Sequence, residues 1–152
     1  DKEYVMTVRF ACETDSCDLT GVPLDLPRGI VPSTGAILDA LKLFTGSIMQ
    51  EPPVFSALKL HGKPLYWYAR QGNPVAADAR PVRIDSIDFV EMIGPDAVFV
   101  VKCGKGAYMR SLGRDIGRAL GCPAHLVALR RTVVGPYNVS DAWPLWRLQN
   151  FR

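Results

Sequence analysis

The sequence predicts an α+β fold, a mixed and largely antiparallel sheet flanked by helices, because strand-like segments outnumber helical ones and neighbours can pair locally. The chain has 152 residues, of which 48% are hydrophobic, so one domain can bury roughly 70% of its unfolded surface. Two strand-like runs, residues 81–93 and 97–103, flank the turn signal Gly94-Pro-Asp96 and predict a hairpin. No repeat or low-complexity linker divides the chain, so we expect a single globular domain.

The first third of the chain predicts a strand, a turn, a loop and a helix. Residues 4–10 alternate in the manner of a half-buried strand, and a polar turn follows over residues 14–21. Three prolines then indicate a loop, at Pro23, Pro27 and Pro32. Ser33 is a favoured N-cap, so we expect a helix over residues 34–44 that Gly46 ends. Its apolar stripe consists of Ile37, Leu38, Leu41 and Phe44.

The rest of the chain predicts short elements on either side of the hairpin. They are a strand at 47–50, a strand at 55–60 with a turn at His61-Gly62, a helix at 65–71 closed by Gly72, a helix at 107–120 that stops at Gly121, a strand at 125–134 and a helix at 143–148.

Positive charge is concentrated around the 107–120 helix. Residues 102–131 hold seven Lys or Arg side chains and a single acid, Asp115. Steps of four residues place Arg110, Arg114 and Arg118 along one helix face, and an apolar face can pack on a core, at Met109, Leu112, Ile116 and Ala119. This concentration is typical of a phosphate-binding surface, with RNA or DNA as the first candidate partner. An ordinary solvated helix face is the alternative.

Several classes of function find no support in the residues. His61 and His125 are far apart and have no carboxylate at ligand spacing, so we expect no metal site. The chain has no G-x-S-x-G motif, and Gly104-Lys-Gly106 is too short for a P-loop. No apolar run is long enough to cross a membrane, and the first residues do not resemble a signal peptide. The four cysteines form no CxxC pair, which favours reduced thiols and a cytoplasmic location.

Four sequence blocks occur in a fixed order over nearly the whole chain. They are Lys2-Glu-Tyr4; Thr14-Asp-Ser-Cys-Asp18 with Gly21; Gln50-Glu-Pro-Pro-Val-Phe-Ser-Ala-Leu-Lys59 with Gly62 and Tyr66-Trp-Tyr-Ala-Arg70-Gln-Gly72; and Cys103-Gly-Lys-Gly-Ala-Tyr-Met-Arg110 with Gly121, His125 and Leu129-Arg-Arg131. Together they resemble the TruB family of pseudouridine synthases.

The resemblance implies an isomerase that converts the T-loop uridine of tRNA (uridine-55) to pseudouridine without a metal or organic cofactor. By position, Tyr4 matches the aromatic residue that stacks on the flipped base, and Arg110 matches the arginine that pairs with the catalytic aspartate. Leu129 matches the apolar residue that closes the pocket, and Asp18 a carboxylate of the polar network beside it. A π face suits an extruded base, and a guanidinium can hold a carboxylate in bidentate geometry.

The resemblance also implies a tRNA partner that binds through its T arm, with no membrane involvement. The residues expected to contact the RNA are cationic or aromatic: Lys2, Lys59, Lys105, Tyr108, Arg114, Arg130 and Arg131.

One part of the family pattern does not occur in this sequence. The nucleophilic aspartate of the family belongs to a G-x-L-D-x-x-A-x-G block, and Asp15, Asp18 and Asp115 do not stand in that context. We therefore expect residues 1–152 to form the central and C-terminal part of a catalytic domain, without the family's PUA domain and inactive alone. Two alternatives stay open, a non-catalytic RNA-binding module and a subunit completed by a second chain that carries the aspartate.

Overall fold

A computed structural model describes residues 1–149 of the chain. The elements are β1 (Lys2–Phe10), α1 (Thr34–Leu41), the 3-10 turn η1 (Lys42–Phe44), β2 (Gly46–Gln50), β3 (Lys59–Leu60), β4 (Lys63–Pro64), α2 (Leu65–Arg70), β5 (Arg80–Ile93), β6 (Asp96–Cys103), α3 (Met109–Ala119), β7 (Ala124–Val134), β8 (Tyr137–Asn138), η2 (Val139–Asp141) and α4 (Leu145–Gln149). Six strands form one sheet in the order β2-β5-β6-β1-β7-β8, with every pair antiparallel. The predicted α+β fold class and the β5–β6 hairpin are confirmed.

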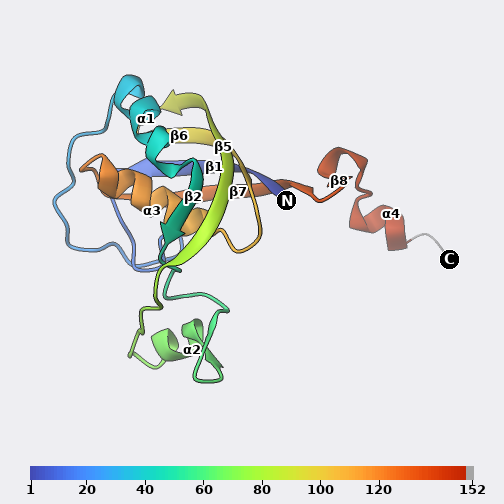
Figure 1. Cartoon of the computed structure of the whole chain (residues 1–152), viewed down its shortest axis with the longest axis horizontal. Coiled ribbons are helices and arrows are strands. Elements are labelled where there is room, and N and C mark those ends of the chain that lie inside the picture. The colour runs from blue at the N-terminus through green and yellow to red at the C-terminus, as the bar shows by residue number, and fades with distance from the viewer. Residues whose placement is uncertain (150–152) are drawn as a thin grey trace.

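The central strand β1 shows why one face of the sheet is covered by helices. Along β1, Met6, Val8 and Phe10 are buried, whereas Arg9 between them is exposed. Successive side chains of a strand point to opposite faces, so the buried set lies on one face. Helices α1 and α3 pack on that face and contribute Ile37 and Leu112 among other residues to the same core cluster (Figure 1).

Helix α3 lies very close to the sheet because two of its residues have no side chain. A Cβ added at Gly117 would stand 2.5 Å from the Cβ of Ala124 and 2.7 Å from the carbonyl oxygen of Cys122. At Gly113 it would stand 3.1 Å from Cγ2 of Val8. The glycines thus set how closely α3 packs on β1 and β7, and this packing carries the start of the helix to its place above the sheet.

Residues 54–78, including α2, form a small module that projects from the sheet (Figure 1). The expected strand over residues 55–60 is wrong for its first four residues. The carbonyl of Ser56 accepts from the N–H of Tyr66, and that of Leu58 accepts from the N–H of Leu65. Backbone groups that a sheet neighbour would use are thereby engaged at the start of α2. Only β3 pairs as a strand, with β4.

Two smaller corrections concern the first and last helices. The expected helix over residues 34–44 is α-helical only to Leu41 and continues as η1. Leu38 does not join the buried stripe, because 46% of it is exposed. At the other end of the chain, the helix expected over residues 143–148 is observed as α4, from Leu145 to Gln149. It follows β8, the last strand of the sheet, and η2, and it lies away from the main body (Figure 1), with Leu145 and Trp146 exposed.

Candidate active site at the start of helix α3

Arg110 lies at the N-terminal end of α3, and a glycine-rich turn connects β6 to this end of the helix. Gly106 in that turn has a φ of +86°, a conformation that suits glycine. The turn is followed by Tyr108, and α3 begins at Met109. Met109 is buried in the core, whereas the Arg110 side chain is 25% exposed. The packing of Met109 on the core therefore leaves Arg110 at the rim of the helix, facing neighbouring loops.

Three groups from two distant loops surround the Arg110 guanidinium. Nη2 donates to the carbonyl oxygen of Phe55 at 2.8 Å, and Nη1 donates to the carbonyl oxygen of Ser16 at 3.3 Å. Nη1 also lies 3.6 Å from Oδ2 of Asp18. The two carbonyl bonds fix the plane of the guanidinium, which is the pre-organisation that a planar fork of donors permits.

Asp18 is held in place by its own loop. Its Oδ1 accepts from Oγ of Ser16 at 2.7 Å and from the backbone N–H and Oγ1 of Thr20 at 3.0 and 2.7 Å. Burial alone would raise the pKa of Asp18, but the hydrogen bonds from Ser16 and Thr20, together with the charge of Arg110, lower it below the ordinary value. Asp18 is therefore an ionised, immobilised carboxylate beside Arg110.

Two pockets open on either side of the Arg110–Asp18 pair. One, of about 390 Å³, is lined by these two residues and by residues 19–20 and 126–129. The other, of about 290 Å³, is lined by the same pair, by Phe55, and by Asp15, Ser16, Thr20, Gly21 and Val22 of the turn. A larger pocket of about 510 Å³ lies elsewhere, around Phe10 and the proline-containing loop, and includes none of the predicted catalytic residues. Of the four predicted catalytic residues, Arg110 and Asp18 thus line both of the first two pockets, and Leu129 lines the 390 Å³ pocket.

Strand β7 supplies the wall of the 390 Å³ pocket. The N–H of Leu126 donates to the carbonyl oxygen of Cys17 at 3.0 Å, and Asp18 forms a parallel bridge with Leu126. The 14–18 loop is thereby fastened to the edge of β7. Further along the strand, Leu129 is 48% exposed and lines the pocket. The structure brings Leu129, Arg110 and Asp18 together, as the sequence predicted.

Tyr4 lies on the same sheet face as Leu129 but does not line either pocket. In the β1–β7 register, Met6 is opposite Leu129 and Tyr4 is opposite Arg131. Tyr4 and Leu129 are therefore diagonal neighbours on the face that α3 covers. Tyr4 is half-buried and packs against the core, so its ring stands at the margin of the site.

The expected open face of three arginines on α3 is wrong. Arg114 is only 6% exposed, and its Nε donates to Asp115 at 2.8 Å while its Nη2 donates to the carbonyl oxygen of Glu51 at 3.2 Å. Arg118 donates to both carboxylate oxygens of Glu13, at 2.5 and 3.1 Å. Both guanidinium groups are bound by acceptors of the protein itself, and Arg114 is also buried, so the expectation that Arg114 faces a phosphate has no support in its geometry.

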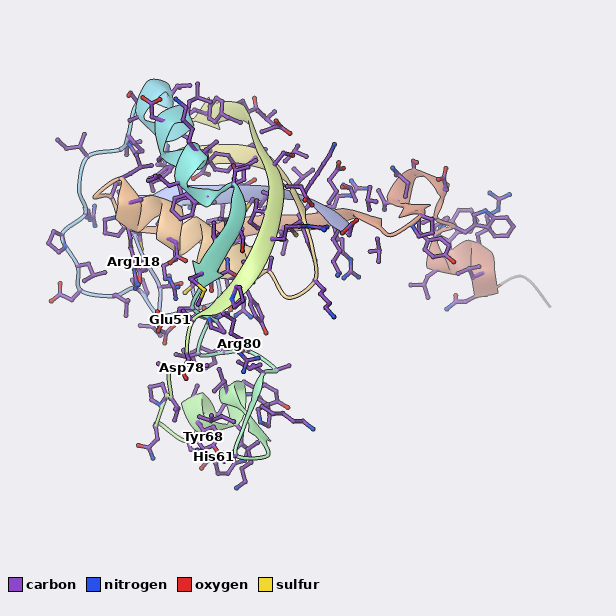
Figure 2. All side chains as sticks on the ribbon, viewed as in Figure 1. Glu51, His61, Tyr68, Asp78, Arg80 and Arg118 are labelled. Atoms are coloured by element: carbon purple, nitrogen blue, oxygen red, sulfur yellow. The ribbon has the colours of Figure 1, made fainter. Side chains whose placement is uncertain are left out.

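The remaining residues expected to contact RNA are spread over the molecule. Lys59 lies in the projecting module that also carries His61 and Tyr68, away from Arg118 on the main body (Figure 2). Arg130 and Arg131 are exposed on β7, next to Leu129, and Lys105 is exposed in the turn before α3. Lys2 begins β1, and Tyr108 precedes α3; both are partly buried. Within residues 1–149, no ion pair engages these lysines or the two β7 arginines.

Sequence reasoning missed the residue that joins β2 to α3. Gln50, only 2% exposed, accepts from the N–H of Tyr108 at 2.7 Å and donates to the carbonyl oxygen of Tyr108 at 3.2 Å. The available signal was a polar residue at the end of an apolar strand, within one of the four blocks.

Within residues 1–149, no three His, Cys, Asp or Glu side chains are placed to hold a metal ion. His125 is buried, and its Nδ1 lies 2.7 Å from the carbonyl oxygen of Cys12. All four cysteines are free thiols. No helix among the described residues is long and apolar enough to cross a membrane.

Comparison with known proteins assigns two family models to the chain. Residues 1–109 match the TruB family pseudouridylate synthase N-terminal domain, and residues 110–152 match the tRNA pseudouridylate synthase B C-terminal domain. The tRNA pseudouridine synthase B of Bordetella pertussis is 48% identical over 98% of this chain and 62% of its own length. That of Haemophilus influenzae strain PittEE is 44% identical over 98% of this chain and 48% of its own length. The chain thus spans about half to three fifths of these relatives.

Solved structures show the same fold. A Cbf5-Nop10-Gar1 complex contains a chain that matches with a TM-score of 0.62 and 31% identity, over 91% of this chain and 31% of that one. An H/ACA RNP bound to a substrate RNA containing 2'-deoxyuridine matches with a TM-score of 0.57 and 28% identity, over 91% and 29% of the two chains.

Proposed function

The chain belongs to the TruB family of pseudouridine synthases, and we propose that it forms part of the catalytic domain of a tRNA pseudouridine synthase. The observation that carries the proposal is the Arg110 guanidinium, fixed by two carbonyl oxygens between two pockets. The named relatives at 44–48% identity are tRNA pseudouridine synthases. The substrate is the T-loop uridine of tRNA, bound through the T arm, and the four free thiols favour a cytoplasmic location.

Both matched ranges belong to one catalytic domain in this proposal. The boundary between the two family models falls at Met109 and Arg110, within the first turn of α3. Strand β1 from the first range pairs with β7 from the second along its whole length. A division at this point would separate strands of one sheet, so residues 1–149 support a single folding unit.

The reaction needs no net oxidant or reductant, because uridine and pseudouridine are isomers. The bond from C1′ of the ribose to N1 breaks, the base turns, and a bond from C1′ to C5 forms; C5 loses a proton and N1 gains one. In the proposal, Arg110 binds the nucleophilic aspartate and keeps it ionised. Asp18 balances the guanidinium charge and holds it in position. Leu129 closes the 390 Å³ pocket on the extruded base, and Tyr4 stacks on that base from the neighbouring strand.

The nucleophilic aspartate comes from a G-x-L-D block outside residues 1–152, on a preceding segment or on a second chain. Among residues 1–149, Asp18 at 3.6 Å is the only acidic side chain that pairs with Arg110, and in the proposal the guanidinium binds the nucleophilic carboxylate as a second acid. The exposed cations on β7 and in the module, Arg130, Arg131 and Lys59, contact the RNA backbone. Phosphate contacts of this kind supply affinity and register rather than base identity.

The proposal is tested with the extended protein, meaning this chain joined to a relative's segment that carries the G-x-L-D block. The substrate is a T-arm stem-loop whose uridines carry tritium at C5, since C5 loses its hydrogen when it becomes the glycosidic carbon. We expect tritium release from the T-loop uridine. No release by a folded extended protein that binds the RNA would favour a non-catalytic RNA-binding module. Release only from another class of RNA would overturn the tRNA assignment.

A further inference from the structure

Helix α3 begins without a cap from its own sequence. The first four N–H groups of an α-helix have no partner inside the helix. In α1 the N-cap Ser33 solves this locally, because its Oγ accepts from the N–H of Ala36 at 3.2 Å. In α3 the N-cap position is Tyr108, whose side chain makes no capping hydrogen bond. The start of α3 therefore depends on groups from elsewhere in the chain.

Gln50, 58 positions away, binds the backbone of Tyr108, the residue from which α3 starts. It ends β2, is 2% exposed, and uses both ends of its amide on the backbone of Tyr108. Oε1 accepts from the N–H, and Nε2 donates to the carbonyl oxygen. That oxygen also accepts the helical bond from the N–H of Leu112. The side-chain amide thus fixes the peptide groups from which α3 starts.

The segment that follows Gln50 extends the same attachment to Arg110. Oγ of Ser111, which is fully buried, donates to the carbonyl oxygen of Glu51 at 2.7 Å. Four residues further on, the carbonyl oxygen of Phe55 accepts from Nη2 of Arg110 at 2.8 Å. Residues 50–55 therefore hold the helix backbone at one end and the guanidinium at the other, with Gln50 as the first point of attachment.

We propose that Gln50 is a positioning residue for Arg110, acting through the backbone of Tyr108 to set where α3 begins. Arg110 is the second residue of the helix, so a shift of the first turn moves its guanidinium relative to the pocket. The inference rests on the proposed function of Arg110. A displacement of about 1 Å at a reacting group can cost roughly 100-fold in rate.

The test compares the activities of two variants. A purely structural role and a positioning role of Gln50 predict opposite orders of activity for them. Gln50→Met has a similar length and is apolar, but it removes both bonds to Tyr108. Gln50→Glu keeps the acceptor for the Tyr108 N–H, but it buries a carboxylate. Burial of a charge is costlier than burial of a thioether, so a merely structural role makes the Glu variant the poorer enzyme. Positioning makes the Met variant the poorer one. Ile84→Val, in the core of β5, is the control for general loss of stability.

Two measurements are made. In the 152-residue chain, the rate of hydrogen exchange of the Tyr108 amide measures the strength of its hydrogen bond to Gln50. We expect this rate to be about tenfold faster in Gln50→Met and unchanged in Ile84→Val. In the extended protein, kcat and KM are measured on the T-arm stem-loop. We expect kcat to fall at least tenfold in Gln50→Met and less in Gln50→Glu, with KM within about twofold of wild type.

The outcomes separate the two levels of inference. Unchanged Tyr108 exchange in Gln50→Met overturns the cap itself. Faster exchange with a kcat equal to that of Ile84→Val overturns the positioning role and leaves the proposed function intact. A kcat that follows the measured stabilities of the two variants also overturns positioning. An extended wild-type protein that forms no pseudouridine overturns the proposed function and this inference with it.

Discussion

Arg118 and Glu13, 105 positions apart in the sequence, form a two-point ion pair across the base of α3. The Glu13 carboxylate is 2% exposed, and both of its oxygens accept from the Arg118 guanidinium. Arg118 itself is half exposed. A cation that the sequence places on an open helix face therefore anchors the 10–18 segment, and with it the loop that carries Asp18.

Removal of this arginine leaves a buried carboxylate without a partner. We expect Arg118→Ala to lower the free energy of unfolding by about 1–3 kcal/mol, since an unsatisfied buried acceptor keeps its desolvation cost. Urea denaturation measures the change. Arg9→Ala is the matched control, because Arg9 binds Asp96 in the same two-point manner but at a more exposed carboxylate; there we expect less than about 1 kcal/mol. Equal losses in the two variants would refute the role given to burial.

The close approach of α3 to the sheet makes Gly117 a sensitive position. In Gly117→Ala the new methyl group would overlap Ala124 and the Cys122 carbonyl, and we expect a loss of roughly 1–3 kcal/mol from forced rearrangement. Thermal or urea unfolding provides the measurement. Gly104→Ala is the control, since its nearest neighbour would be Nε of Arg83 at an ordinary 3.5 Å. A stable Gly117→Ala variant would show that the helix can move away from the sheet without cost.

Asp18 gives the site a defined response to acid. Its pKa in the folded protein lies below the ordinary value of 3.8, so folding favours the ionised form. The resulting stabilisation is complete above the ordinary pKa and is lost as the pH falls through the lower, folded pKa. We expect the stability difference between wild type and Asp18→Asn to shrink from about pH 5 to about pH 2. Urea titrations at several pH values measure it, with Glu91→Gln as the control. A difference that grows on acidification would contradict the direction of the shift.

The exposed arginines of β7 should determine part of the salt dependence of RNA binding. The affinity for RNA falls as the salt concentration rises, and loss of one phosphate contact makes the slope of log affinity against log salt concentration less steep by about one. We expect the double variant Arg130→Ala, Arg131→Ala to have a slope for the T-arm stem-loop that is less steep than that of the wild type by about two. Fluorescence anisotropy over a salt series provides the slope. Arg9→Ala, whose guanidinium is bound by Asp96, should leave it unchanged; an equal fall there would argue against a specific role for β7.

The sequence was sufficient to predict elements whose signals are local. The alternation of β1 and the turn at Gly94 predicted the strand and the hairpin, and the order of the four blocks was not needed for either. The partners of Arg114 and Arg118 could not be predicted in this way. Glu51 and Glu13 lie 63 and 105 residues away, and only the packing of α3 on the sheet brings them close.

The candidate site also combines residues that could be assigned from the sequence with contacts that could not. Arg110, Asp18 and Leu129 were assigned by resemblance, and the structure brings them together around one pocket. The groups that orient Arg110 are mainly backbone carbonyls, of Ser16 and Phe55. Every residue has a backbone carbonyl, so the residue types do not show which carbonyls bind Arg110. These contacts could be found only from the three-dimensional structure. Residues 55–58 do not form the expected strand for the same reason, because backbone carbonyls of this segment bind the start of α2.

The single-turnover rate of Arg110→Lys in the extended protein shows whether Arg110 holds the nucleophilic carboxylate. Lysine keeps the charge but loses the planar fork that binds Ser16, Phe55 and a carboxylate together. We predict a rate of pseudouridine formation about 100-fold or more below wild type, with unchanged affinity for the T-arm stem-loop. A lysine variant that forms pseudouridine at the wild-type rate would show that the Arg110 guanidinium does not hold the nucleophile.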